Sequence, residues 1–217
     1  MWEEYGYQAG PLPELTPVLK KWIQVNKEYV LRSGGKDAPW WYNERASLSP
    51  VAAAAWLAKG IALEEYLTDK HKISRKGKRK RTDRGRCDLY FSVKRRRKSG
   101  RDHEFIAEAK IIWPSIASRG LQTQLDRGIS SARDAVRCTF SYGEVRRLGL
   151  LLITPTASNS AARRWNEHLP RFLNVLRAQE RVAIAWLFTE NPRQLTYGRR
   201  KEFFPGTAIL FSPLRQV

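Results

Sequence analysis

Two neighbouring segments with a two-residue period constrain the fold of this chain more than any other feature. Apolar side chains occupy every second position in residues 86–93 (RCDLYFSV) and again in residues 104–113 (EFIAEAKIIW). A period of two is typical of β-strands that bury one face. The connecting stretch contains Ser99-Gly100, so a β-hairpin is the economical interpretation. The polar faces of the two strands then carry Asp88, Glu108 and Lys110.

The rest of the chain alternates between helical and strand patterns. Ser49-Pro50 is a suitable N-cap and first-turn pair for a helix over 51–69. The continuous apolar run LGLLLIT predicts a central strand covered on both faces. Other helices are predicted near 15–31, 120–137 and 161–179, and other strands near 182–188 and 207–211. This order predicts an α/β fold with a mixed central sheet flanked by helices.

The organisation expected from these patterns is one α/β domain over residues 49–217, preceded by an aromatic-rich, helical N-terminal extension over residues 1–48. No run of about 18 apolar residues occurs, so no transmembrane helix is predicted. The first residues have no basic start followed by an apolar core, so no secretory signal is predicted. Two cysteines in unrelated contexts indicate neither a disulfide framework nor a zinc site. A cytoplasmic or nucleoid-associated location fits these features.

The charge balance points to a polyanionic partner. The chain has 40 Lys and Arg against 21 Asp and Glu among 217 residues, a formal net charge of +19. Such a surplus favours nucleic acid, because each neutralised phosphate releases condensed counterions. A membrane surface is disfavoured, because no basic amphipathic helix with a clean apolar face is present.

Two basic runs, residues 70–86 and 94–101, are too charged to be core and are predicted to be loops. One precedes the first alternating strand and the other lies at the hairpin tip. A charge run is usually a solvated face, but these two flank the polar strand faces. Contacts with the nucleic-acid backbone are therefore expected from Arg75, Lys76, Lys78, Arg79, Lys80, Arg95, Arg96 and Arg97.

The polar strand faces have the composition of a divalent-metal site. A turn near Lys98-Ser99 places Asp88 opposite Ala109, and hence beside Glu108 and Lys110 if all three side chains share a face. Two neighbouring carboxylates repel unless a cation lies between them. Oxygen ligands suit Mg²⁺ or Mn²⁺, and the carbonyl of Ala109 could add another. Lys110 could orient or help to deprotonate a water, and the metal would polarise a phosphate.

More ordinary interpretations remain open for each of these residues. Glu108 and Lys110 are also what a solvated strand face would show. Glu64 falls within the apolar stripe of the predicted helix 51–69. It is either functional, a sign that the helix phase is wrong, or a buried acid paired with an arginine. Gln122 is equally an ordinary helix-surface residue.

Asp88 followed by Glu108-Ala109-Lys110 after a short hairpin resembles the PD-(D/E)XK nuclease superfamily, which has the restriction-endonuclease-like fold. The resemblance covers roughly residues 50–155 and implies an αβββαβ core with metal-dependent phosphodiester hydrolysis. It also implies an acid from the preceding helix, for which Glu64 is the candidate and Glu65 the fallback, and in one branch a Gln in the following helix, here Gln122.

The chain departs from that pattern at two positions. Cys87 precedes Asp88 where the motif has proline, and Asp126 stands where the branch that uses the Gln has tyrosine. The branch is therefore unassigned. The first strand of the implied meander is also not evident, and the basic segment before Arg84 could contain it.

These observations predict a metal-dependent endo- or exonuclease that acts on DNA, with Mg²⁺ or Mn²⁺ as cofactor. DNA is preferred over RNA because of the resemblance. One alternative is a catalytically silent DNA- or RNA-binding protein. Another is an accessory subunit of a nucleoprotein assembly. A homodimer and a larger nucleoprotein complex are both compatible with the sequence.

Overall fold

The computed structural model describes residues 2–73, 79–95, 101–139, 144–191, 193, 196–197 and 202–214. Within these ranges the main sheet has seven strands in the order β1-β6-β9-β5-β4-β3-β2. They are β1 (Trp2–Gln8), β2 (Ala62–Ile73), β3 (Arg79–Val93), β4 (His103–Ile112), β5 (Arg146–Ile153), β6 (Ala183–Thr189) and β9 (Gly206–Pro213). A small additional sheet in the same ranges pairs β7 (Thr196–Tyr197) with β8 (Glu202–Phe203). The α-helices are α1 (Thr16–Arg32), α2 (Glu44–Leu57), α3 (Leu121–Cys138), α4 (Asn159–Arg163) and α5 (Trp165–Arg177), and short 3₁₀ turns cover Pro13–Leu15 and Pro39–Trp41.

The main sheet is mixed, as the sequence predicts. β2, β3 and β4 form an antiparallel meander, and β4 then pairs with β5 in parallel. A parallel pair needs a crossover connection, and α3 supplies it. β9 pairs antiparallel with both β5 and β6, and β6 pairs antiparallel with β1.

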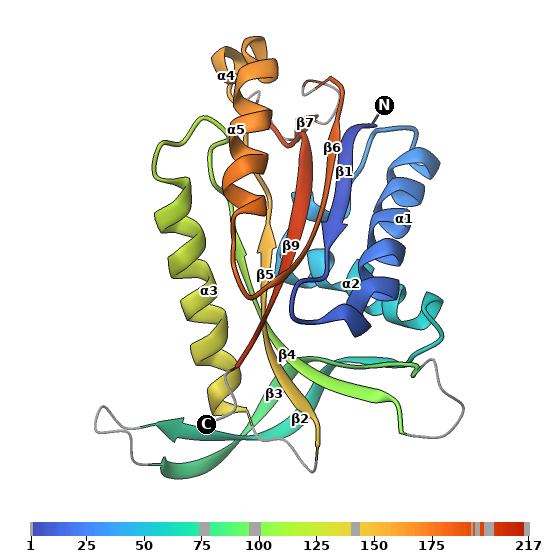
Figure 1. Cartoon of the computed structure of the whole chain (residues 1–217), viewed down its shortest axis with the longest axis vertical. Helices are drawn as coiled ribbons and strands as arrows, with labels where there is room; N and C mark the ends of the chain where they lie inside the picture. The colour runs from blue at the N-terminus through green and yellow to red at the C-terminus, as the bar shows by residue number, and fades with distance from the viewer. Residues whose placement is uncertain are drawn as a thin grey trace.

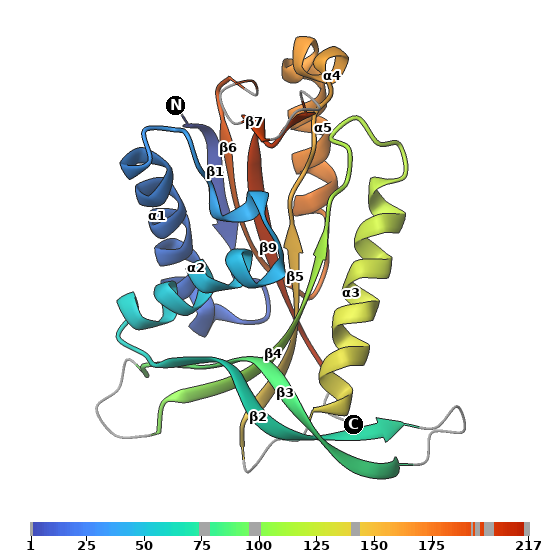
Figure 2. The same cartoon turned by 180° about the vertical axis from the view of Figure 1, so that it is seen from behind.

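Helices cover both faces of the sheet, with α1 and α2 on one side and α3 and α5 on the other (Figures 1 and 2). Successive residues of β5 show the two layers directly. Leu150 packs in the apolar cluster with Trp22 of α1, whereas Leu151 packs in the cluster with Leu125 of α3 and Phe172 of α5. β5 is buried on both faces, which confirms the interpretation of its continuous apolar run.

The helix expected over 51–69 is wrong at both ends. α2 begins at Glu44, because the Asn43 side chain caps it by accepting a hydrogen bond from the Ala46 amide (3.0 Å). It ends at Leu57, after which Lys59 adopts a left-handed backbone conformation (φ 66°). A Cβ at Gly60 would lie 1.9 Å from the Ser92 carbonyl oxygen, so the chain passes too close to β3 there for any other residue.

The segment that follows, together with most of the first basic run, forms strands instead of a helix and a loop. β2 extends to Ile73 and β3 begins at Arg79, so the basic run 70–86 lies largely within a β-hairpin. β3 pairs with β4 only from Leu89 onward, whereas its earlier residues pair with β2 alone. We call this two-stranded part, residues 66–73 and 79–87, the basic ribbon. It runs out beyond the rest of the sheet and passes beneath the C-terminal end of α3 (Figures 1 and 2).

The N-terminal 48 residues are integrated into the same sheet. β1 forms its edge strand against β6, and α1 packs beside α2. The sequence predicted a helical extension here, and this is wrong in part, because the segment also contains the strand β1. No helix in the described ranges is long and apolar enough to cross a lipid bilayer.

Candidate active site at the free edge of β4

Asp88 lies where β3 separates from β4. The hairpin register pairs Leu89 with Ala107, one residue away from the expected register that put Asp88 opposite Ala109. Cys87 and Leu89, which alternation would place on one face, belong to different apolar clusters, so the strand is distorted at Asp88. The Asp88 carboxylate accepts a hydrogen bond from the Ala109 amide at 2.7 Å. The carboxylate thus replaces the backbone carbonyl that would accept this hydrogen bond if β3 continued to pair with β4.

Lys110 closes over the same edge of β4. Its ammonium group donates a hydrogen bond to the carbonyl oxygen of Ala109 at 2.7 Å. The amide and the carbonyl of one strand residue point to the same edge, so Asp88 and Lys110 approach Ala109 from the side that β3 has left. The structure therefore brings together three groups that the sequence proposed: Asp88, the Ala109 backbone and Lys110.

Glu44, which is not among the residues predicted from the sequence, lies at the same edge of β4. It is the first residue of α2, and it accepts a hydrogen bond from the backbone amide of Ile111, two residues beyond Ala109. Burial raises the pKa of Glu44; the nearby cation of Lys110 lowers it, whereas Asp88 and Glu65 raise it further. An acid from the helix before the meander does reach the site, but it is Glu44 and not Glu64.

Glu108 is held on the side of α3. It is almost fully buried, with the Thr139 hydroxyl donating to one carboxylate oxygen at 2.5 Å and Lys70 forming an ion pair with the other at 2.9 Å. Burial raises its pKa, the hydrogen bonds from Thr139 and Lys70 lower it, and the charge of Asp88 raises it. Glu108 is thus close enough to Asp88 to feel its charge, while both of its own oxygens are engaged.

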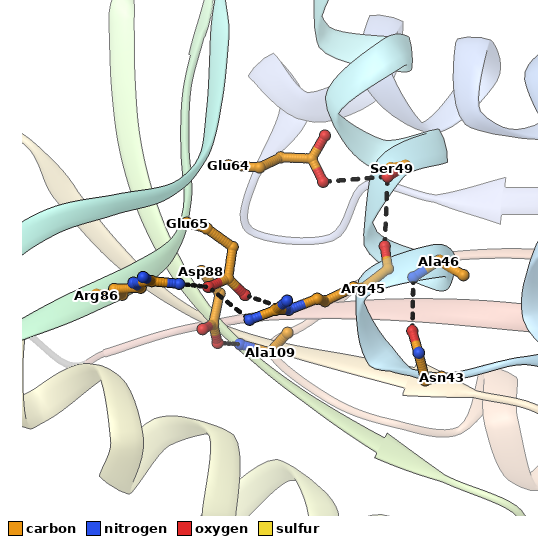
Figure 3. A network of polar contacts seen from close by, with 9 residues as sticks. All are labelled: Asn43, Arg45, Ala46, Ser49, Glu64, Glu65, Arg86, Asp88 and Ala109. Carbon is orange, nitrogen blue, oxygen red and sulfur yellow. Dashed lines mark hydrogen bonds and ion pairs between the residues drawn. The ribbon is translucent and has the colours of Figure 1, made fainter.

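The two acids proposed from the preceding helix lie on strand β2. Glu64 is exposed and accepts a hydrogen bond from the Ser49 hydroxyl at 3.1 Å, so its expected place on a helix is wrong. Glu65 forms ion pairs with Arg45 at 3.0 Å and with Arg86 at 3.6 Å. Figure 3 shows Glu65 between the two arginines, with Asp88 and Ala109 beside them.

Gln122 does not join these residues. It is exposed in the first turn of α3, where it forms hydrogen bonds with Asp126 and Gln179. Thr139, which contacts Glu108, follows the other end of the same helix. At about 1.5 Å per residue, the two positions are separated by roughly 25 Å along the helix axis.

The residues expected to contact phosphates are only partly described. Arg79 and Lys80 begin β3 at the outer end of the basic ribbon, and Arg95 is exposed just after β3. The other five lie outside the described residues: Arg75, Lys76, Lys78, Arg96 and Arg97.

The oxygen atoms along this edge form an incomplete metal site. No three His, Cys, Asp or Glu side chains of the described residues come close enough to one another to hold a metal ion by themselves. Asp88 and the Ala109 carbonyl do supply hard oxygen atoms at one place, with Glu44 bound to the adjoining amide. Mg²⁺ usually takes one or two protein carboxylates and completes its shell with waters and substrate phosphate.

The pair Asn43-Glu44 carries a local signal for the acid that the sequence analysis missed. Asn is a preferred N-cap, and an acid in the first turn after it is a helix-start signal. Ser49-Pro50 offers a second start six residues later, and the predicted helix began there.

No protein-family model matches this chain, and no curated protein or solved structure matches it significantly.

Proposed function

We propose that this chain is a metal-dependent nuclease that hydrolyses DNA phosphodiester bonds with an activated water. The observation that carries the proposal is the convergence of Asp88, Glu44 and Lys110 on the backbone edge of β4 that β3 leaves free. Two acids and a lysine around the Ala109 backbone are the groups that a divalent cation and a phosphate together require.

The order of the elements supports the same proposal. α2, β2, β3, β4, α3 and β5 follow one another as helix, three-stranded meander, helix and strand. This is the αβββαβ order of the restriction-endonuclease-like core that the Asp88…Glu108-Ala109-Lys110 pattern resembles. The acid on the first helix and the Glu-Ala-Lys strand occupy the corresponding elements.

The donor set suits a hard divalent cation. Asp88 uses one carboxylate oxygen for the Ala109 amide, which leaves the other for a ligand. Burial raises the pKa of both Glu44 and Glu108, so each is an acid whose anionic form gains from a nearby positive charge. Asp88, Glu44 and the Ala109 carbonyl would hold Mg²⁺ or Mn²⁺. When bound, such an ion polarises the phosphate and lowers the pKa of a water.

The other residues have separable roles in this proposal. Lys110 neutralises charge at the free edge and orients the attacking water through its ammonium group. Glu108 ties the basic ribbon to the site through its ion pair with Lys70. The surplus of positive charge on the chain brings in the polyanionic substrate.

One observation favours a second candidate, a catalytically silent nucleic-acid-binding protein. Glu108 has both oxygens engaged by Thr139 and Lys70, so it would have to exchange a partner before it could ligate a metal. A protein that used the fold and the basic ribbon only for binding would keep Glu108 in this position. An accessory subunit of a nucleoprotein assembly would require the same binding surface.

A cleavage panel separates these candidates. Linear, circular and branched DNA, together with RNA, are incubated with the wild-type chain in Mg²⁺, Mn²⁺ or EDTA. We expect metal-dependent cleavage of DNA that falls by at least about a hundredfold in Asp88→Asn, which removes a metal ligand, and in Lys110→Gln, which removes the group that orients the attacking water. Binding of uncut DNA should be retained in both variants.

The matched controls are Asp126→Asn and Lys21→Gln, which remove the same charges from an exposed position on α3 and a half-buried position on α1. Both should cleave like the wild type. DNA binding by the wild type without cleavage of any substrate in either metal would instead establish the binding protein.

A further inference from the structure

Two arginines and one glutamate form a separate charged group beside the proposed active site. Glu65 of β2 accepts two hydrogen bonds from Arg45, from Nε at 3.0 Å and from Nη2 at 3.2 Å. Arg86 of β3 lies 3.6 Å from the same carboxylate through Nη1. The arginine side chains are 69% and 61% exposed, and that of Glu65 is 29% exposed. One carboxylate thus holds two solvent-facing guanidinium groups, one on either side of it (Figure 3).

The backbone of Glu65 is arranged to make this contact. Its φ is +53°, a left-handed conformation that costs free energy in a residue with a side chain. In a regular strand Glu64 and Glu65 would point to opposite faces. Here both reach α2, since Glu64 bonds Ser49 and Glu65 bonds Arg45. The strained residue therefore turns its carboxylate towards the arginines.

The group adjoins the acids at the edge of β4. Arg45 directly follows Glu44 in α2, and Arg86 lies two residues before Asp88 in β3. Both Asp88 and Glu65 raise the pKa of Glu44, so each of these two carboxylates lies within electrostatic range of Glu44. Arg86 also lies in the inner part of the basic ribbon.

We propose that Arg45 and Arg86, held in place by Glu65, bind a backbone phosphate of DNA next to the phosphodiester that is cut. Glu65 occupies Nε and Nη2 of Arg45 and only Nη1 of Arg86, so N–H groups of both remain without an acceptor among the described residues. Paired guanidinium groups suit phosphate, because each presents several donors in a plane. The position of the cut phosphate rests on the proposed function, whereas phosphate binding by the arginines does not.

The chain contains ordinary ion pairs that serve as matched controls. Arg32 pairs with Glu28 on α1 at 2.7 Å, and Arg137 pairs with Asp134 on α3 at 2.8 Å. Both arginines are exposed, at 79% and 58%, and each is held by one acid of its own helix. A surface ion pair of this kind contributes little to stability, so replacing Arg32 and Arg137 should not impair folding.

The experiment measures binding without cleavage. The affinity of the Arg45→Gln/Arg86→Gln double variant for a fluorescein-labelled DNA duplex is titrated in EDTA over a range of NaCl concentrations. We expect the slope of log K against log salt to become shallower by about 0.9, which corresponds to the one phosphate charge that is no longer neutralised. The Arg32→Gln/Arg137→Gln variant loses the same charge and should keep the wild-type slope. Arg45→Lys/Arg86→Lys should keep the slope but bind several-fold more weakly, because it loses the planar donors.

Each remaining result overturns one claim. Equal reduction of the slope in the two Gln double variants, or no reduction in either, rejects the phosphate site. So does the absence of any DNA binding by the folded wild type. A normal Arg45/Arg86 effect in a protein that never cleaves DNA rejects the nuclease and keeps the phosphate site. Metal-dependent cleavage of DNA by the wild type, with an unchanged slope in the Arg45→Gln/Arg86→Gln variant, rejects the phosphate site and keeps the nuclease.

Discussion

The negative charge of the Glu44 carboxylate is unfavourable in its half-buried position, even with the ammonium group of Lys110 nearby. Burial raises its pKa above 4.5, Asp88 and Glu65 add to that shift, and Lys110 opposes it. A carboxyl with a raised pKa in the folded state favours folding below its unfolded pKa. That contribution is lost as the pH rises through the folded value, so ionised Glu44 lowers the free energy of unfolding at neutral pH. A bound divalent cation would offset this loss.

We therefore predict that Glu44→Gln stabilises the metal-free protein at neutral pH. Its Tm should rise by roughly 1–3 °C above that of the wild type, and the difference should vanish below about pH 4, where the wild-type carboxyl is protonated. Added Mg²⁺ or Mn²⁺ should raise the Tm of the wild type more than that of the variant, because the variant lacks a ligand. Thermal denaturation at several pH values, with and without metal, measures both effects.

Glu28→Gln is the matched control, because Glu28 is an exposed acid on α1 that pairs with Arg32. It should respond to metal like the wild type. A Glu44→Gln variant that is less stable than the wild type at neutral pH, or that gains as much from metal, would exclude Glu44 from the metal site.

The sequence predicted some of these residues and missed others for physical reasons. Strand alternation singled out Asp88 and Lys110, because a period of two is a local property. The alternation also placed Glu108 on the same strand face. It could not predict the contacts of Glu108 with Thr139 and Lys70, because these contacts join segments far apart in the chain. Glu44 was missed because its position depends on where α2 begins.

Among the elements, the prediction succeeded where the pattern is local and strong. α1, α3, β5, β6 and β9 lie within two residues of the expected bounds, since each helix is set by its own apolar period and each strand by its own apolar run. The transition from α2 to β2 was missed, because the stop at Gly60 is enforced by close contact with Ser92 on another strand. The basic run 70–86 was taken for a loop, because its charge conceals the pairing of β2 with β3.

Thr139 joins three of these elements. It follows α3, forms a bridge with Lys70 of β2 and donates its hydroxyl to Glu108 of β4. We predict that Thr139→Val lowers the free energy of unfolding by about 1.5–3 kcal/mol at neutral pH, because it leaves a buried carboxylate without one of its donors. Urea denaturation measures the change, and a double-mutant cycle with Glu108→Gln should show that the two substitutions are coupled.

Thr154→Val supplies the control for the removal of a buried hydroxyl. Thr154 is fully buried like Thr139, but its hydroxyl has no hydrogen-bond partner among the described residues. The substitution should leave stability unchanged or raise it slightly. If Thr139→Val costs no more than Thr154→Val, then Thr139 does not hold Glu108 in place.

At the scale of the molecule, the proposed active site adjoins the basic ribbon within the described residues. The free edge of β4, the N-terminus of α2 and the base of the basic ribbon adjoin one another there (Figures 2 and 3). The net charge of +19 alone says only that a polyanion is attracted. Its placement decides whether that polyanion reaches Asp88, and the composition could not predict this placement because it follows from the pairing of β2 with β3.

The first basic run of the sequence, residues 70–86, is predicted to bind DNA directly. A variant with Gln at Arg75, Lys76, Lys78, Arg79 and Lys80 should bind DNA with a salt slope shallower by up to about 4.5, or about 0.9 for each phosphate that the run no longer neutralises. A control with Gln at Lys20, Lys21, Lys27, Arg32 and Lys36 removes five positive charges in and around α1. Anisotropy titrations of both against one duplex separate local binding from net charge. The slope should fall far more in the basic-run variant than in the control, and an equal fall in both would mean that DNA responds to the total charge and not to the basic run.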